Sequence, residues 1–168
     1  MNFKKMNPDE LSINPFSLIG NDWMLITAGT VKSFNTMTAS WGGLGVLWHK
    51  NVCFIFIRPQ RYTFEFLDRS GTFTLCFFHE KYRDVLKYCG SKSGRDVNKV
   101  DKTGITPHKT KNGSVYFLEA EIVIECRKIY FHDIDPRNFL DPAIEEKYTD
   151  NDYHRMFIGE IISCMKKE

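Results

Sequence analysis

The segment VYFLEAEIVIECRK, residues 115–128, gives the clearest indication of the fold. Its apolar and acidic side chains alternate, and this period of two is typical of a β-strand that buries one face. The side chains expected to point inward are Leu118, Ala120, Ile122, Ile124 and Cys126. Those expected to face water are Glu119, Glu121 and Glu125, with Val123 as the one exception on that side. The chain is therefore predicted to build its core from strands.

Further segments have strand patterns bounded by polar or turn residues: WMLITAGT (23–30), VCFIFI (52–57), TFTLCFF (72–78) and HRMFIGEIISC (154–164). Short helices are predicted over 62–71 and 81–90, the second ending at Gly90 as its capping glycine. Many strands with a few short helices predict a mainly β protein. We expect a closed or partly closed β-barrel with helices on its outside.

Composition limits the class of protein. With 168 residues and 42% apolar content, the chain suits one domain, residues 1–168, with a sizeable core. A net charge of +2 gives no reason to expect binding to DNA or to a membrane surface. No apolar run approaches the roughly 20 residues that cross a bilayer. The N-terminal MNFKKMNPDELS lacks the apolar core of a signal peptide, so we expect a cytoplasmic protein.

The cysteines are scattered and never spaced as CxxC, which argues against a disulfide framework or a zinc site. We expect core thiols at Cys53, Cys76, Cys89, Cys126 and Cys164. Charge is uneven along the chain. Residues 81–112 hold nine Lys or Arg against three Asp, a balance of +6, whereas residues 133–153 have a balance of −5. Either the two segments complement each other as solvated loops, or part of the basic one contacts a phosphate.

The familiar short motifs of nucleotide binding and hydrolysis are missing. The sequence contains no GxGxxG, GxxxxGK[ST], HExxH or GxSxG pattern. No nucleophile and base lie together in the local sequence either. If the protein is an enzyme, the difficult chemistry is therefore expected to belong to a cofactor.

The segment FNTMTASWGGLGVLWHK (34–50) combines hydroxyls, glycines and two indoles. Thr36, Thr38 and Ser40 would share one side of a strand, as donors for phosphate or ribityl oxygens or as an ordinary solvent-facing edge. The glycines would let the main chain approach a ligand closely, and an indole would give a flat ring its apolar wall.

Two other segments combine charge with free backbone groups. In RPQRYT (58–63), Arg61, Tyr62 and Thr63 would begin a helix, whose free N–H groups attract an anion; Thr63 would otherwise be only the N-cap. CGSKSGRDVNK (89–99) predicts a polar loop that leads into a short helix, or a surface turn with an ordinary Arg–Asp pair. Among the histidines, His154 has the most site-like surroundings.

Taken in order, NTMTASWGGLGVLW, RPQRYTFEFLDRSGTFTLCFF, YCGSKSGRDVNK and DYHRMFIGEI resemble the flavin reductase-like family, and more narrowly its flavoredoxin-type branch. The resemblance extends from about residue 20 to residue 163. It implies the FMN-binding split β-barrel fold and a homodimer with FMN at or near the subunit interface. Some relatives continue past the last strand, whereas this sequence ends at Glu168, so a more open pocket is expected.

The resemblance also implies a set of cofactor-binding residues. Along the flavin and its ribityl chain it places Asn35, Met37, Thr38, Ala39 and Ser40, with Trp41 near the ring or the phosphate tail. The phosphate-side motif is Arg58, Arg61, Tyr62 and Thr63. The loop that closes over the cofactor, from the same or the partner subunit, holds Ser91, Lys92, Ser93 and Arg95. His154 and Phe157 would approach from the last strand. No catalytic acid or base and no metal ligand are implied.

The function implied is an oxidoreductase that passes electrons from NAD(P)H or a protein donor through FMN to an acceptor. The alternative is an FMN-binding electron carrier that does not turn over NAD(P)H. A small barrel that binds single-stranded nucleic acid is disfavoured. Such proteins interleave aromatic and basic residues, and the strands at 52–57 and 72–78 contain no basic residue.

Overall fold

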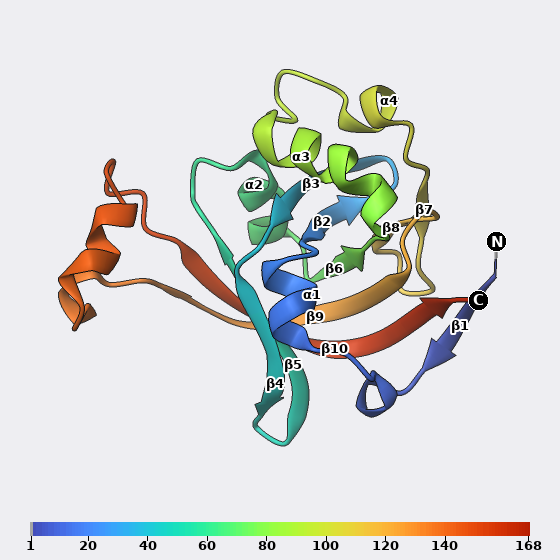
Figure 1. The fold of residues 1–168 in the computed structure, drawn as a ribbon, viewed down its shortest axis with the longest axis horizontal. Helices are drawn as coiled ribbons and strands as arrows, with labels where there is room; N and C mark the ends of the chain where they lie inside the picture. The colour runs from blue at the N-terminus through green and yellow to red at the C-terminus, as the bar shows by residue number, and fades with distance from the viewer. Residues whose placement is uncertain (1) are drawn as a thin grey trace.

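The computed structural model describes residues 2–168 and is built mainly from β-strands (Figure 1). The strands are β1 (Phe3–Met6), β2 (Met24–Thr30), β3 (Ser33–Ala39), β4 (Gly42–Leu47), β5 (Lys50–Ile57), β6 (Thr72–Phe77), β7 (Pro107–Lys109), β8 (Val115–Phe117), β9 (Ile122–Asp133) and β10 (Arg155–Lys167). The α-helices are α1 (Pro15–Gly20), α2 (Tyr62–Arg69), α3 (Arg83–Ser91) and α4 (Lys99–Thr103). Short 3-10 turns are η1 (Pro8–Glu10), η2 (Glu80–Tyr82), η3 (Pro136–Asn138) and η4 (Pro142–Lys147). None of the described helices is long and apolar enough to cross a membrane.

The main sheet is antiparallel and has the strand order β3-β2-β6-β9-β10-β5-β4, with β1 added on β10. Strands β7 and β8 form a separate hairpin. The strands at the two ends of this order, β3 and β4, are joined in the chain by Ser40 and Trp41 alone. The sheet therefore curls back on itself and leaves a split between these two strands. This arrangement confirms the prediction of a mainly β fold with short flanking helices.

The inner face of the sheet holds the main core. Ile26, Ile55, Phe73, Ile124 and Phe157 come from five different strands, and each is fully buried. The burial of one large apolar side chain contributes about 1.5–3 kcal/mol, so these residues favour the closed form of the sheet. The strands predicted at 52–57, 72–78 and 154–164 are confirmed. So is the strand predicted at 23–30, which begins one residue later, at Met24.

The outer face of the central strands is covered as well. Helix α3 brings Leu86 and Cys89 against Leu25, Cys76 and Val123, and all five are buried. The prediction for residues 115–128 is wrong in two respects. The chain turns between β8 and β9 instead of running on as one strand, and the face expected to meet water is buried at Val123 and Glu125.

Glu125 is held by side chains of the segment between β7 and β8. Its exposed fraction is 1%, the Thr110 hydroxyl donates to its Oε1 over 2.6 Å, and the Asn112 amide donates to its Oε2 over 3.0 Å. Because a buried carboxylate without donors is costly, these two hydrogen bonds allow the acid to lie under the hairpin. Glu125 thus fastens the β7–β8 hairpin to the sheet.

Gly90 has a different role from the predicted one. Helix α3 continues through Ser91 and ends with Lys92 as its C-cap, so Gly90 lies inside the last turn. A Cβ at Gly90 would lie 3.2 Å from the Cβ of Thr38 on β3. The glycine therefore lets α3 lie close to β3, next to the split in the barrel.

All five cysteines are buried and unpaired, which confirms the interpretation as core thiols. The Sγ atoms of Cys53 and Cys126 lie 3.3 Å apart inside the barrel. Burial raises the pKa of the Cys76 thiol to about 12 and that of Cys164 to about 11. The cysteines therefore act as small apolar residues of the core.

Residues 134–154, between β9 and β10, form an arm that projects from the barrel at the left of Figure 1. The basic segment 81–112, which includes α3 and α4, lies at the top of the same view. Across the described part of the chain, no ion pair joins residues 81–112 to residues 133–153. Within one chain, the two charged segments therefore do not complement each other as loops in contact.

Candidate functional site

Two cavities meet beside the split in the barrel, where β3 ends and α2 begins. Cavity A has a volume of about 250 Å³ and is lined by Met37, Thr38, Ala39, Ser40, Trp41, Phe56, Arg58, Arg61 and His154. Cavity B has a volume of about 300 Å³ and is lined by Asn35, Met37, Gln60, Arg61, Tyr62, Thr63, Ser91, Lys92, Ser93, Gly94 and Lys99. Met37 and Arg61 belong to both walls, so the cavities adjoin.

The sequence prediction and these cavities largely coincide. Of the sixteen residues predicted to bind the cofactor, fourteen line cavity A or cavity B. They come from β3 and its connection to β4, the β5–α2 connection and the first turn of α2, the end of α3 and the loop after it, and the residue before β10. The exceptions are Arg95, which lies on the outer side of that loop, and Phe157. Segments far apart in the sequence are thus brought to one place by the fold.

Cavity B has the properties of an anion site. Arg61 is the N-cap residue of α2 and its side chain makes no capping hydrogen bond, so the first N–H groups of the helix have no side-chain partner there. The Arg61 guanidinium is exposed, and its Nη1 donates to the carbonyl of Gly90 over 3.1 Å. This bond aims a cation at the junction of the two cavities, beside the positive end of a helix.

Lys99 adds a buried charge that sequence reasoning missed. Its exposed fraction is 6%, and Nζ donates to the carbonyl oxygens of Thr36 (2.7 Å) and Cys89 (2.8 Å). Burial lowers its pKa to about 8, and the nearby Arg61 charge lowers it as well. Lysine is almost never buried unless it is paired, so the sequence pattern gave no reason to place it inside. The one signal was its place in the SGRDVNK segment, directly after the helix cap Asn98.

Cavity A combines apolar rings with a neutral histidine. The Trp41 side chain is 49% exposed, and its ring lies 5.1 Å from the ring of His154. Nδ1 of His154 is 3.0 Å from the hydroxyl of Tyr148 in the arm. Burial lowers the pKa of His154 to about 4, and the Arg58 charge lowers it further. At neutral pH the imidazole is therefore uncharged and held in one orientation.

Together the cavities suit a ligand that joins a flat ring to an anionic tail. Cavity A offers aromatic walls, and cavity B offers three cations (Arg61, Lys92 and Lys99) and the start of a helix. Comparison with known proteins gives the same indication, because the sequence profile of the flavin reductase like domain matches residues 16–168. The chain belongs to the flavin reductase-like family. No curated protein sequence matches it significantly.

Solved structures share the fold of this flavin reductase-like protein. An FMN-binding domain of a flavin reductase-like enzyme from Shewanella baltica superposes with a TM-score of 0.71 at 17% identity, covering 98% of this chain and 77% of that one. Flavoredoxin of Desulfovibrio vulgaris gives 0.68 at 23% identity, with the same coverage. The NADH:FAD oxidoreductase of Streptomyces globisporus, in complex with NAD and FAD fragments, gives 0.66 at 16% identity over 87% of this chain and 74% of that one. At these identities the likeness concerns the fold.

Phe157 lies inside the barrel of this flavin reductase-like protein instead of at the cavities. Its exposed fraction is 0%, and its ring packs 5.9 Å from that of Phe64 and 6.3 Å from that of Phe131. The expectation that it approaches the site is therefore wrong. His154 and Phe157 are three residues apart, and alternation along an extended chain sends such residues to opposite faces.

Two of the three hydroxyls in the predicted ladder, those of Thr36 and Thr38, are already used within the protein, whereas Ser40 lines cavity A. The hydroxyls of Thr36 and Thr27 share a buried 2.9 Å hydrogen bond, and the Thr38 hydroxyl donates to the carbonyl of Leu86 in α3. These groups are neither ligand donors nor a solvent-facing edge. Thr63 is buried in the first turn of α2 and is not the N-cap of that helix. Its hydroxyl accepts a 2.7 Å hydrogen bond from the side-chain amide of Asn35.

Arg58 holds the arm against cavity A. Its Nη1 is 2.6 Å and 2.7 Å from the carboxylate oxygens of Asp152, and its Nη2 donates to the carbonyl of Lys147 over 2.8 Å. Its guanidinium also lies 5.2 Å from the centre of the Tyr148 ring. The expected phosphate-side role does not fit this geometry, because Asp152 balances the charge and Arg58 does not line cavity B.

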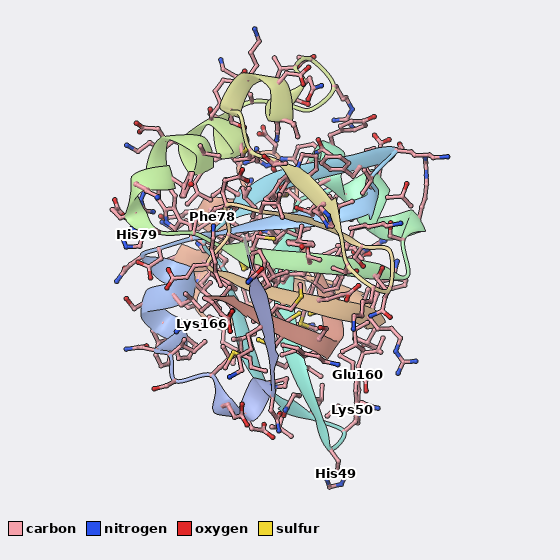
Figure 2. The ribbon with its side chains drawn as sticks, turned by 90° about the vertical axis from the view of Figure 1, so that its right-hand side faces the viewer. His49, Lys50, Phe78, His79, Glu160 and Lys166 are labelled. Carbon is pink, nitrogen blue, oxygen red and sulfur yellow. The ribbon has the colours of Figure 1, made fainter. Side chains whose placement is uncertain are left out.

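The glycines after Trp41 line neither cavity A nor cavity B, and of the three only Gly42 lies too close to its neighbours for a side chain, whereas Gly43 and Gly45 have room for one. A Cβ at Gly42 would lie 2.7 Å from the carbonyl oxygen of Phe54, and one at Gly45 would lie 3.7 Å from the Phe54 ring. Trp48 is at the far turn of the β4–β5 hairpin, with its ring 6.0 Å from that of Tyr130. Figure 2 shows His49 at the same tip, pointing away from the body of the protein. Trp41 is thus the indole at the candidate site, and Trp48 is outside it.

In the loop after α3, Arg95 pairs with Glu65 of α2 instead of with Asp96. Its guanidinium also lies 4.7 Å from the centre of the Tyr62 ring. The loop is therefore tied to the first turns of α2, which form the floor of cavity B. This contact replaces the ordinary Arg–Asp pair that the sequence left open.

The histidine in cavity A leads to a testable expectation about pH. Because its pKa is lowered to about 4, His154 should remain neutral from pH 5 to pH 8. Its ring-carbon NMR chemical shifts should then be constant over this range. The assignment would come from comparison with a His154→Gln variant. A shift change centred between pH 6 and pH 7 would contradict the burial seen in the structure.

Proposed function

We propose that this flavin reductase-like protein binds FMN across cavities A and B and works as an oxidoreductase in the cytoplasm. It would take electrons from NAD(P)H or a protein donor and pass them to an acceptor. The observation that carries the proposal is the convergence of Lys99, Arg61 and the start of α2 on cavity B, next to the aromatic cavity A. Membership of the flavin reductase-like family supports a flavin as the ligand.

The charges of cavity B match those of a phosphate monoester. Such a group carries about −1.5 to −2 charges at pH 7 and needs several donors. The Arg61 guanidinium and the uncapped α2 N-terminus would donate to it from the rim, and Lys99 would support it from beneath β3. Ser93 would add a hydroxyl donor from the loop after α3, whereas the Ser91 hydroxyl, at the end of α3, already donates to the carbonyl of Tyr88.

The chain itself would supply binding and orientation. Hydride acceptance and electron transfer are the chemistry that a flavin contributes when it is bound. Trp41 and Phe56 would give the ring apolar walls, and neutral His154, fixed by Tyr148, would offer a ring nitrogen at its edge. The geometry of these residues would thus select a flat ring with a polar edge. The proposed reaction requires no side chain to act as an acid or base.

We also propose that the protein forms a homodimer around this site. Cavity A lies beside the half-exposed Trp41, so one chain leaves a bound ring open to solvent. A second subunit would cover this face. The same exposure favours one alternative function, that of an FMN-binding electron carrier, because an open ring edge is available to a redox partner protein.

Two measurements test the cofactor and the activity. The visible absorption spectrum of the purified protein, with the released chromophore identified after denaturation, should show FMN. Steady-state NAD(P)H oxidation by the FMN-loaded protein should then be faster than that by free FMN. Bound FMN without such turnover would favour the electron carrier. A colourless protein that also fails to quench added FMN fluorescence would rule out FMN binding.

The role of Arg61 gives a prediction about affinity. Arg61→Ala should raise the Kd for FMN about tenfold or more, since it removes a charged donor at the phosphate position. Riboflavin, which lacks the phosphate, should bind both proteins equally. Arg137→Ala is the matched control, because Arg137 is exposed in the arm and, within residues 2–168, its one ion pair is with Asp135. Equal FMN affinity of Arg61→Ala and the wild type would refute the phosphate site.

A further inference from the structure

A third cavity, cavity C, lies between α1 and β4, which are next to each other in the fold (Figure 1). Its volume is about 280 Å³. One wall is α1, with Phe16 and Ile19, and the other is the chain from Ser40 to Leu44. Ser40 and Trp41 line cavity A as well, so the two cavities adjoin. A molecule in cavity C would therefore lie beside a ring held in cavity A.

The lining of cavity C differs from that of cavities A and B in its charge. Among residues 2–168, no charged side chain lines cavity C. Cavity A includes Arg58 and Arg61, and cavity B includes Arg61, Lys92 and Lys99. An ion that entered cavity C would lose hydration without gaining a partner of opposite charge, which is costly. Cavity C therefore selects an uncharged ligand, whereas cavities A and B select an anion.

Two aromatic side chains at the rim of cavity C are open to water. Phe16 is 86% exposed and Trp41 is half-exposed. The position of Phe16 is set by the start of α1, where the side-chain oxygen of Asn14 accepts a 3.0 Å hydrogen bond from the main-chain N–H of Phe16. Ile19 follows on the same face of the helix and is buried in the core, which anchors α1. The rim thus offers two fixed apolar surfaces that a flat ring can cover.

The polar groups of cavity C are a hydroxyl and main-chain groups. Strand β4 is the last strand in the sheet order, so about half of its N–H and C=O groups face away from β5. Gly42 and Gly43 place no side chain over this part of the main chain. Together with the Ser40 hydroxyl, these groups can donate to a carbonyl oxygen or accept from a hydroxyl. A flat apolar ring that carries such oxygens suits the cavity.

We propose that cavity C binds a small quinone and that this class of compound is the electron acceptor of the protein. A quinone is flat and uncharged, and its carbonyl oxygens become hydroxyls on reduction, so both forms match the walls. The reduction takes up two electrons and two protons, the same number that a reduced flavin releases when it is reoxidised. The inference rests on the proposed flavin site and adds the class of its acceptor.

The test measures the binding of duroquinone to the FMN-free protein by equilibrium dialysis. Duroquinone is fully substituted, so it does not alkylate thiols. Phe16→Ala removes an exposed ring, which should not affect folding, and should raise the Kd for duroquinone about threefold to tenfold. Phe16→Tyr keeps the ring and should bind as the wild type does. Leu140→Ala is the control, because Leu140 is almost fully exposed in the arm and lines none of cavities A, B and C.

Further measurements separate cavity C from cavities A and B. Saturating FMN should leave the affinity for duroquinone almost unchanged. Anthraquinone-2-sulfonate, an anionic quinone, should bind equally well to Phe16→Ala and the wild type, because cavity C holds no cation for it. After anaerobic reduction of the FMN-loaded protein, the rate of reoxidation by duroquinone should saturate. Phe16→Ala should raise the half-saturating concentration and leave the limiting rate unchanged.

The inference is overturned if duroquinone does not bind saturably, if it binds Phe16→Ala as tightly as the wild type, or if FMN displaces it. Displacement by FMN would place the quinone in cavity A. If Phe16→Ala halves the mass in solution and leaves duroquinone binding unchanged, cavity C is a contact between subunits, and the inference is overturned as well. Binding without saturable reoxidation would overturn the assignment of the acceptor.

These results are distinct from failure of the proposed function, in which FMN itself would not bind. The dialysis with duroquinone still decides about cavity C in that event, because it requires no flavin.

Discussion

Lys99→Met is expected to weaken FMN binding by at least about tenfold. The substitution keeps the aliphatic volume but removes the buried ammonium beneath cavity B, together with its hydrogen bonds to the carbonyls of Thr36 and Cys89. Because water is largely excluded around this group, its attraction for a phosphate is stronger than that of a surface lysine. Fluorescence titration of the apoprotein with FMN measures the effect. Lys102→Met, an exposed position in the same helix, is the control.

The same residue predicts how FMN affinity depends on pH. In the free protein the pKa of Lys99 is lowered to about 8, so it loses its proton as pH rises through this value. A bound phosphate favours the protonated form, so FMN affinity should fall above about pH 8 in the wild type. Lys99→Met should lack this fall. If the variant kept both the affinity and the pH dependence of the wild type, Lys99 would have no part in phosphate binding.

Gly159→Ala is expected to destabilise the barrel by about 1–3 kcal/mol, the typical cost of adding a methyl group to a filled core. Gly159 lies in β10 at a shift in its register with β9. A Cβ there would come 2.6 Å from Cζ of Phe73 and 2.7 Å from the Cβ of Cys126, both fully buried. The strands would have to move apart, since neither contact is the flexible end of a long side chain.

Thermal or urea unfolding of the FMN-free protein measures this change. Gly71→Ala is the matched control, since a Cβ there meets nothing within 4 Å and should leave the midpoint almost unchanged. Equal unfolding midpoints for the two variants would contradict this prediction. They would mean that β10 can shift to accommodate the added methyl group without a loss of stability. Because Gly159 lines none of the three cavities, FMN affinity in the folded fraction should be unaffected.

Local patterns were sufficient for much of this protein. Strand patterns bounded by polar or turn residues located β2, β5, β6 and β10, and the residues around Pro59 located the start of α2. The order of the four segments that contain NTMTASW, RPQRYT, SGRDVNK and DYHRMFIGEI indicated the family, which the domain match over residues 16–168 confirms. These features depend on residues close together in the chain, which is why one sequence is enough to find them.

The tertiary structure decided which of those residues remain available for a ligand. Helix α3 and the β7–β8 segment cover the outer face of β9, so Val123 and Glu125 are buried despite the amphipathic pattern. The Thr36 hydroxyl is occupied by Thr27 of the neighbouring strand. Partners distant in sequence occupy the Thr38 hydroxyl and the Arg58 charge, and Lys99 lies beneath β3. The burial of a side chain and the pairing of its charge depend on contacts between segments that are far apart in the sequence. The local pattern of apolar and polar residues does not reveal such contacts.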